Sequence, residues 1–104
     1  MEVKLFESMD QAKNVLQNKI PRLVRAEGVN ICIIRLGDEL IAFRNECPHM
    51  GESLHRGKIN YLDEMVCPLH TYRFSLRSGD EVGSKCGSLR FIKVVHREQV
   101  YLLL

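Results

Sequence analysis

Several features that would place this protein in a membrane or on nucleic acid are missing from its sequence. No apolar stretch approaches the roughly eighteen residues that a membrane-spanning helix requires. The first residues, Met1–Glu7, lack the basic end, apolar core and cleavage site of a secretory signal peptide. A formal net charge of +2 is too small to indicate a nucleic-acid or membrane partner. We therefore expect a cytoplasmic protein that binds neither.

The chain also lacks the length for two independent hydrophobic cores. It has 104 residues, with no internal repeat and no low-complexity segment, so residues 1–104 are predicted to form a single domain. Nothing in the sequence resembles a nucleophile beside its base, or a phosphate-binding loop. We therefore do not expect the protein to be an enzyme by itself.

Cysteine is scarce, and two of the four cysteines stand in short motifs with histidine. Cys-x-His occupies positions 47–49, and Cys-x-x-His occupies positions 67–70. Disulfides are typical of small exported chains and are not expected here, whereas thiolate and imidazole are metal ligands. Two pairs that each contain one Cys and one His can hold two iron atoms, or a single ion such as zinc. Zinc fingers, however, usually pair Cys with Cys and His with His along the sequence. The candidate metal ligands are Cys47, His49, Cys67 and His70.

The two motifs and their surroundings resemble the cluster loops of soluble Rieske [2Fe–2S] ferredoxins. Residues 43–57, Phe-Arg-Asn-Glu-Cys-Pro-His-Met-Gly-Glu-Ser-Leu-His-Arg-Gly, resemble the first loop, and residues 67–74, Cys-Pro-Leu-His-Thr-Tyr-Arg-Phe, resemble the second. The resemblance implies one [2Fe–2S] cluster, with one iron held by two cysteines and the other by two histidines. It also implies a Rieske-like antiparallel β-sandwich with a small cluster-binding subdomain, approximately residues 45–75, at one end. By position, Cys47 and Cys67 would bind one iron, and His49 and His70 the other.

The hydrophobic pattern separately predicts an all-β protein with one short N-terminal helix. Ser8 and Gln11 form a capping-box signal, and apolar residues at helical spacing predict a helix over residues 9–18, which Pro21 prevents from continuing. Many short strands separated by turns are typical of an antiparallel sandwich or barrel. The predicted strands are 3–6, 22–26, 30–36, 39–44, 58–61, 64–66, 73–76, 89–95 and 99–103.

Residues around the second motif bear on the reduction potential. High-potential members of the family have a Ser two residues, and a Tyr four residues, after the second His, and both donate hydrogen bonds to the cluster sulfurs. This chain has Tyr72 and Phe74 there. Neither loop has a second cysteine, so the disulfide that links the loops in those members cannot form. The resemblance therefore implies a midpoint near the low end of the roughly −150 to +300 mV Rieske range.

The remaining residues near the motifs have mainly structural interpretations. Cys32 lies in an Ile-rich strand and is expected to be a small buried hydrophobe. Cys86 is interpreted as an inert thiol close to the cluster, in a loop (residues 83–89) predicted to be mobile because it lacks the proline usual in the family. His55 is expected to be a solvated loop residue. Five basic residues lie near the motifs: Arg56, Lys58, Arg73, Arg77 and Lys85. Their commoner interpretation is a solvated charged face. The alternative is a docking rim for an acidic redox partner.

The resemblance implies a one-electron carrier. Such a protein takes an electron from a reductase, here expected to be flavin-dependent, and gives it to a terminal oxygenase. It also implies that His49 and His70 lie at the exposed end of the cluster, where the electron would leave. Two alternatives stay open: a non-catalytic small subunit of a nitrite-reductase-like complex, and a zinc-stabilised interaction module.

Overall fold

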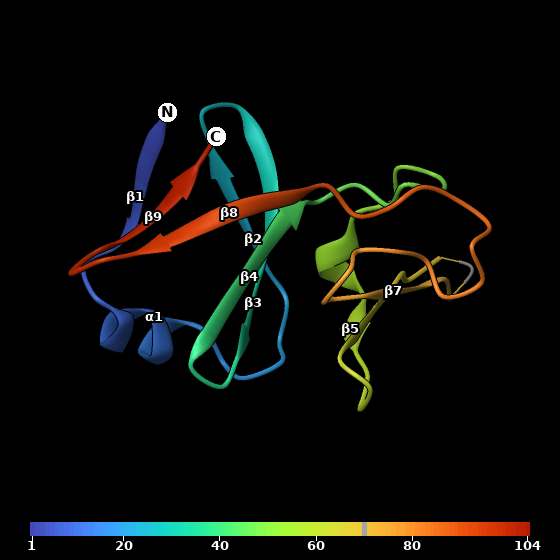
Figure 1. Ribbon diagram of the computed structural model, residues 1–104, viewed down its shortest axis with the longest axis horizontal. Coiled ribbons are helices and arrows are strands. Elements are labelled where there is room, and N and C mark those ends of the chain that lie inside the picture. The colour runs from blue at the N-terminus through green and yellow to red at the C-terminus, as the bar shows by residue number, and fades with distance from the viewer. Residues whose placement is uncertain (70) are drawn as a thin grey trace.

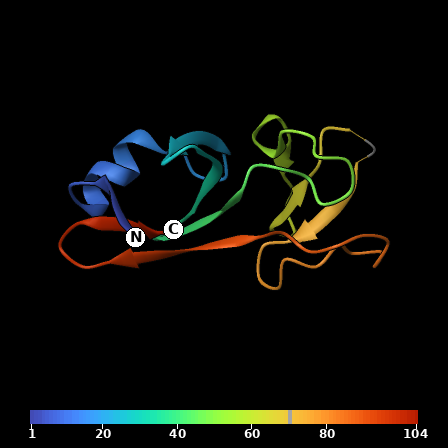
Figure 2. The ribbon, with the colours of Figure 1, turned by 90° about the horizontal axis from the view of Figure 1, so that it is seen from above.

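A computed structural model, which describes residues 1–69 and 71–104, contains two antiparallel sheets of unequal size placed end to end (Figures 1 and 2). The larger sheet has the strand order β1-β9-β8-β4-β3-β2, and the smaller has the order β5-β6-β7. The molecule measures 39 × 28 × 20 Å. The elements are β1 (Glu2–Phe6), α1 (Met9–Val15), β2 (Arg22–Ala26), β3 (Val29–Leu36), β4 (Glu39–Arg44), the 3₁₀ helix η1 (Leu54–Arg56), β5 (Lys58–Ile59), β6 (Glu64–Val66), β7 (Arg73–Ser75), β8 (Phe91–His96) and β9 (Val100–Leu103).

Strands β3 and β4 form a wall between two hydrophobic cores. Side chains alternate across a strand, so neighbouring residues of one strand point to opposite faces. In β3, Ile31 and Ile33 pack with α1, β1 and β9, whereas Cys32 and Ile34 pack with the segments that follow β4. Both faces are covered, which explains why four consecutive residues of β3 are fully buried. The second core extends to the two candidate ligands Cys47 and Cys67.

The N-terminal helix begins as predicted but ends earlier. The backbone N–H of Gln11 donates to Ser8 Oγ at 3.0 Å, which confirms Ser8 as the N-cap. The helix ends at Val15 because Leu16 adopts an extended conformation. The chain then runs beside β3, where the Lys19 N–H donates to the Arg35 carbonyl at 2.8 Å. The helix therefore ends well before Pro21, and the residues after it pair with β3 instead.

All nine predicted strands are present, and the differences lie at their ends. The predicted strand 58–61 is only Lys58–Ile59, because Asn60 Oδ1 accepts the N–H groups of Leu62 and Glu64 and starts the turn. The last hairpin begins at Phe91 rather than at residue 89. The short helix η1 is not predicted by the sequence pattern. Among the described residues, no helix has the length and apolar character needed to cross a bilayer.

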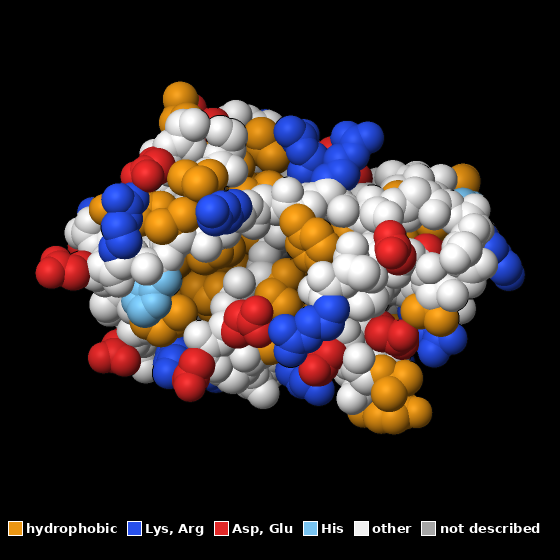
Figure 3. Space-filling model, viewed as in Figure 1, with side chains coloured by type: hydrophobic (Ala, Val, Ile, Leu, Met, Phe, Trp, Pro, Cys, Tyr) orange, Lys and Arg blue, Asp and Glu red, His pale blue; other side chains and the backbone are white. Residues whose placement is uncertain are grey.

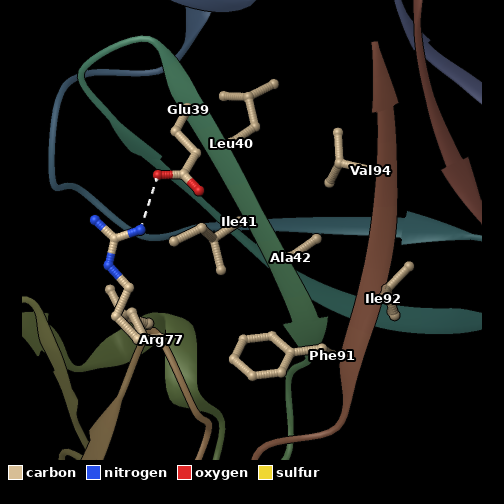
Figure 4. Close-up of a pocket in the computed structure, with 9 residues that line it drawn as sticks. Glu39, Leu40, Ile41, Ala42, Arg77, Phe91, Ile92 and Val94 are labelled. Carbon is tan, nitrogen blue, oxygen red and sulfur yellow. Dashed lines mark hydrogen bonds and ion pairs between the residues drawn. The ribbon is translucent and has the colours of Figure 1, made fainter.

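A groove separates the two parts of the molecule on one face. Strands β4 and β8 pair only at Ala42–Ile92 and Phe43–Phe91 and then diverge. The opening between them, about 250 Å³, exposes part of the apolar core, with charged residues of both signs around it (Figure 3). Arg77 Nη1 reaches across to Glu39 Oε1 at 3.3 Å (Figure 4). This ion pair links the β7–β8 connection to the start of β4, away from the cysteine loops.

Candidate metal centre

The two cysteine loops are built on the same plan. The backbone N–H of Cys47 donates to the carbonyl of Glu52, and that of Cys67 donates to the carbonyl of Tyr72, both at 2.8 Å. Each bond closes a six-residue loop at the residue that carries the thiol. The first loop follows β4, and the second connects β6 to β7. Cys67 is thereby fixed directly after β6, and Cys47 three residues after β4.

Both loops turn at their fifth position through left-handed backbone. Gly51 has φ 73° and Thr71 has φ 55°. Glycine adopts this conformation freely, so the turn at Gly51 is readable in the sequence. A β-branched threonine is disfavoured there, so Thr71 gives no sequence signal, and its strain is held by the surrounding loop.

The fold brings the two predicted cysteine ligands together. Cys47 and Cys67 are both buried in the same core, and the thiol of Cys47 lies close enough to affect the pKa of Cys67. Burial, together with the neighbouring Cys47, raises the pKa of Cys67 to about 11, so without a metal this thiol holds its proton. Iron binds the thiolate, so loading the site must release that proton. A close pair of buried thiols on two closed loops fits one side of a Cys₂His₂ cluster.

The histidine side of the predicted site is only partly described. His49 is half-buried, and its ring contacts that of Tyr72. His70 lies outside the described residues. Among the described residues, no three side chains of His, Cys, Asp or Glu converge closely enough to form a metal site. The structure thus joins the two cysteines and leaves the complete four-ligand set as a prediction.

A buried asparagine supports the first loop and was not identified from the sequence. Asn45 Oδ1 accepts the backbone N–H of His55 at 2.7 Å, and Asn45 Nδ2 lies 2.8 Å from His55 Nδ1. The backbone N–H of Asn45 donates to the Asn30 carbonyl, which ties this pair to β3. The expectation that His55 is a solvated loop residue is therefore wrong, because its ring is half-buried and bonded. The only sequence signal was an Asn two residues before the first ligand.

A carboxylate organises the loop that lacks proline. Glu81 is buried, and its two carboxylate oxygens accept the N–H groups of Gly83 at 2.8 Å and Lys85 at 2.7 Å. These bonds, Lys85 first, hold the pKa of Glu81 below its ordinary value. The Val82 N–H also donates to the carbonyl of Arg73 in β7. Residues 83–89 are thus anchored to the small sheet, although their sequence suggested a mobile loop.

Two further cysteines occupy the environments predicted for them. Cys32 is completely buried in β3, and burial raises the pKa of its thiol to about 12. Cys86 is partly buried and packs against the core that contains Cys47. Burial, and then the charge of Glu81, raises the pKa of Cys86 as well. Neither thiol has the lowered pKa of a reactive cysteine.

The five basic residues whose alternative interpretation was a docking rim do not form one group. Arg73 pairs with Glu64 at 3.4 Å, and Arg77 pairs with Glu39. Lys85 lies close enough to Glu81 to help lower the pKa of that carboxyl. The other two, Arg56 and Lys58, line a cavity of about 220 Å³ beside Cys67.

A two-sheet, all-β architecture whose smaller sheet adjoins two cysteine-bearing loops defines the class of Rieske-fold proteins. The family model of the Rieske [2Fe–2S] domain matches residues 7–90, and the chain belongs to this family. Its cofactor is accordingly one Rieske-type [2Fe–2S] cluster, which replaces the zinc alternative. Family and fold together support a role in electron transfer.

Individual relatives agree with this assignment. The ferredoxin of carbazole 1,9a-dioxygenase from Nocardioides aromaticivorans IC177 is 27% identical, with a TM-score of 0.79 over 98% of this chain and 96% of that one. A ferredoxin structure described as a complex of reduced oxygenase and oxidized ferredoxin in carbazole 1,9a-dioxygenase is 26% identical, with a TM-score of 0.77 over 97% and 91% of the chains. The oxygenase subunit of carnitine monooxygenase from Acinetobacter baumannii is 37% identical over 60 residues. These residues are 57% of this chain but only 16% of that relative.

Proposed function

We propose that the protein is a one-electron carrier whose [2Fe–2S] cluster is held by Cys47 and Cys67 on one iron and by His49 and His70 on the other. The observation that carries the proposal is the meeting of the two cysteine thiols at the ends of two loops closed in the same way. When bound, the cluster supplies a single reversible redox step. With four protein ligands, such a cluster would have no open position for a substrate.

The chain's own residues would give the cluster a rigid and partly dry environment. Backbone bonds fix both cysteines, and the buried Leu54, Phe74 and Leu89 pack in the same core as the thiols. A preformed site of this kind needs little rearrangement when the electron arrives or leaves. His49 and His70, as the ligands expected nearest to solvent, are the proposed exit for the electron.

The proposed acceptor is a terminal oxygenase, and the proposed donor is a flavin-dependent reductase. Support for the acceptor comes from a related ferredoxin described in complex with its oxygenase. The carnitine monooxygenase relative is itself an oxygenase subunit. The donor is inferred only from how such carriers are generally reduced. The small-subunit alternative differs in one respect: the protein would co-purify with a large nitrite-reductase-like partner.

Replacing each cysteine singly by alanine tests the proposed ligands. The four variants are Cys47→Ala, Cys67→Ala, Cys32→Ala and Cys86→Ala. The aerobically purified wild type should be red-brown, contain iron and acid-labile sulfide in equal amounts, and give a Rieske EPR signal when reduced. We expect the first two variants to lose iron and sulfide, and the last two to keep both. A colourless zinc-bound wild type, or full cluster content after loss of Cys47 or Cys67, would overturn the proposal.

A further inference from the structure

We propose that the outer face of the small sheet, with Lys58 and Arg73, forms together with the adjoining Arg56 at the end of η1 the docking surface for an acidic redox protein. This inference rests on the proposed electron-carrier function and adds the chemistry and position of the partner. We call this surface the basic sheet face.

The register of the small sheet places two of these cations in one row. Lys58 pairs with Val66, and Val66 pairs with Arg73, so the three side chains lie side by side on one face. The neighbouring row, Ile59–Met65–Phe74, points the other way, and Met65 and Phe74 are fully buried in the core. The row with Lys58 and Arg73 must therefore face solvent, and both residues are exposed.

A cavity connects this face to the proposed metal centre. It measures about 220 Å³, and its lining includes Arg56, Lys58, Cys67 and Pro68. Among its described lining residues there are two cations and no acid. A carboxylate of a partner entering here would be stabilised by two positive charges and would stand beside a proposed ligand of the cluster.

Acidic residues nearby do not cancel the charge of this face. Glu64 lies on the same face, where it shares its carboxylate between Arg73 at 3.4 Å and Asn60 Nδ2 at 2.8 Å. Glu81 is turned into its own loop by two backbone bonds. Within the described part of the chain, Arg56 and Lys58 form no ion pair. Exposed apolar residues at the edge, Pro68 and Leu69, would add contact area to a partner that binds here.

Voltammetry on a gold electrode with a carboxylate-terminated monolayer tests the proposal without a known partner, because the monolayer supplies the acidic surface. The test variant is R56Q/K58Q/R73Q. The matched control is R22Q/R25Q/K93Q, whose residues lie exposed on β2 and β8 of the larger sheet. Each variant lowers the net charge from +2 by 3, to −1, so any difference between them reflects where the charge lies.

We expect the test variant to exchange electrons with the acidic monolayer at least about tenfold more slowly than the control, with the difference vanishing at high salt. Equal electron-exchange rates for the two variants would overturn the proposal that the basic sheet face is a docking surface. If the triple variant does not fold, R56Q/K58Q against R22Q/R25Q makes the same comparison and leaves Glu64 its partner. On a neutral hydroxyl-terminated monolayer, all folded variants should share one reversible midpoint. A wild type without a reversible wave on either surface would overturn the carrier function itself, and the docking face with it.

Discussion

The ring of Tyr72 lies 4.3 Å, centroid to centroid, from the imidazole of His49, with 35° between the two ring planes. The carbonyl of the same tyrosine accepts the N–H of Cys67. One residue of the second loop therefore contacts a proposed ligand in each loop. This arrangement would set the position of the first loop relative to the second before any metal binds.

Replacing Tyr72 by leucine should therefore loosen His49 while leaving the strands intact. We expect a loss of about tenfold in retention of the cluster against a chelator, the scale usual for residues that support metal ligands. Tyr72→Phe should keep the ring contact with His49. In the metal-free protein, NMR should show the ring-current shift of the His49 protons disappearing in Tyr72→Leu only. Tyr61→Leu is the matched control, since Tyr61 is 86% exposed in the β5–β6 turn. Identical His49 signals in both leucine variants would contradict the idea.

The carboxylate of Glu81 should make the folding stability of the protein depend on pH. Its folded pKa lies below the ordinary 4.5, because the Lys85 and Gly83 N–H groups bond the charged form. The stabilisation is complete above about pH 4.5 and is lost as the pH falls through the lower folded value. Glu81→Gln should lower the melting temperature of the metal-free protein by a few degrees at neutral pH, and by less in acid.

Thermal unfolding followed by circular dichroism at a series of pH values measures this effect. Glu98→Gln is the control, because Glu98 is exposed in the β8–β9 turn and loses the same charge. Parallel pH curves for Glu81→Gln and the wild type would show that the bonds to the loop contribute nothing. Faster amide exchange at residues 83–85 in Glu81→Gln would locate the change in the loop.

The sequence predicted the parts of this protein that are determined by local pattern and by ligand chemistry. Alternating or continuous apolar residues located the strands of the larger sheet, and the spacing of Cys and His located both loops. Features that depend on distant contacts were not predictable. Asn45 and His55 bond across ten residues, and the Val82 N–H bonds to the carbonyl of Arg73 in β7. The left-handed Thr71 opposes its own backbone preference, so only the folded loop explains it.

Phe74 offers a way to raise the reduction potential. It is fully buried in the core that contains Cys47 and Cys67, and its ring carries no hydrogen-bond donor. High-potential members of the family have a tyrosine at this place, whose hydroxyl bonds a cluster sulfur. We therefore expect a wild-type midpoint below about 0 mV, and a rise on the order of 60 mV in Phe74→Tyr if the new bond favours the reduced state by ~1.4 kcal/mol.

Film voltammetry of the purified proteins measures both values. Phe91→Tyr serves as the control, since it adds the same hydroxyl to a ring that is 43% exposed in the groove between β4 and β8. A wild-type midpoint well above zero, or equal shifts in the two tyrosine variants, would mean that donors at position 74 do not set the potential.

The two cysteines outside the proposed site should differ sharply in reactivity. Only a thiolate reacts with iodoacetamide, and a thiol whose pKa is about 12 is ionised in roughly one molecule in ten thousand at pH 8. Cys32 is also fully buried, whereas Cys86 is partly exposed. Mass spectrometry of the folded protein should find Cys86 alkylated at least about 100-fold faster than Cys32, with the two rates converging in denaturant. Rapid labelling of Cys32 without denaturant would mean that β3 opens far more easily than its position between two cores implies.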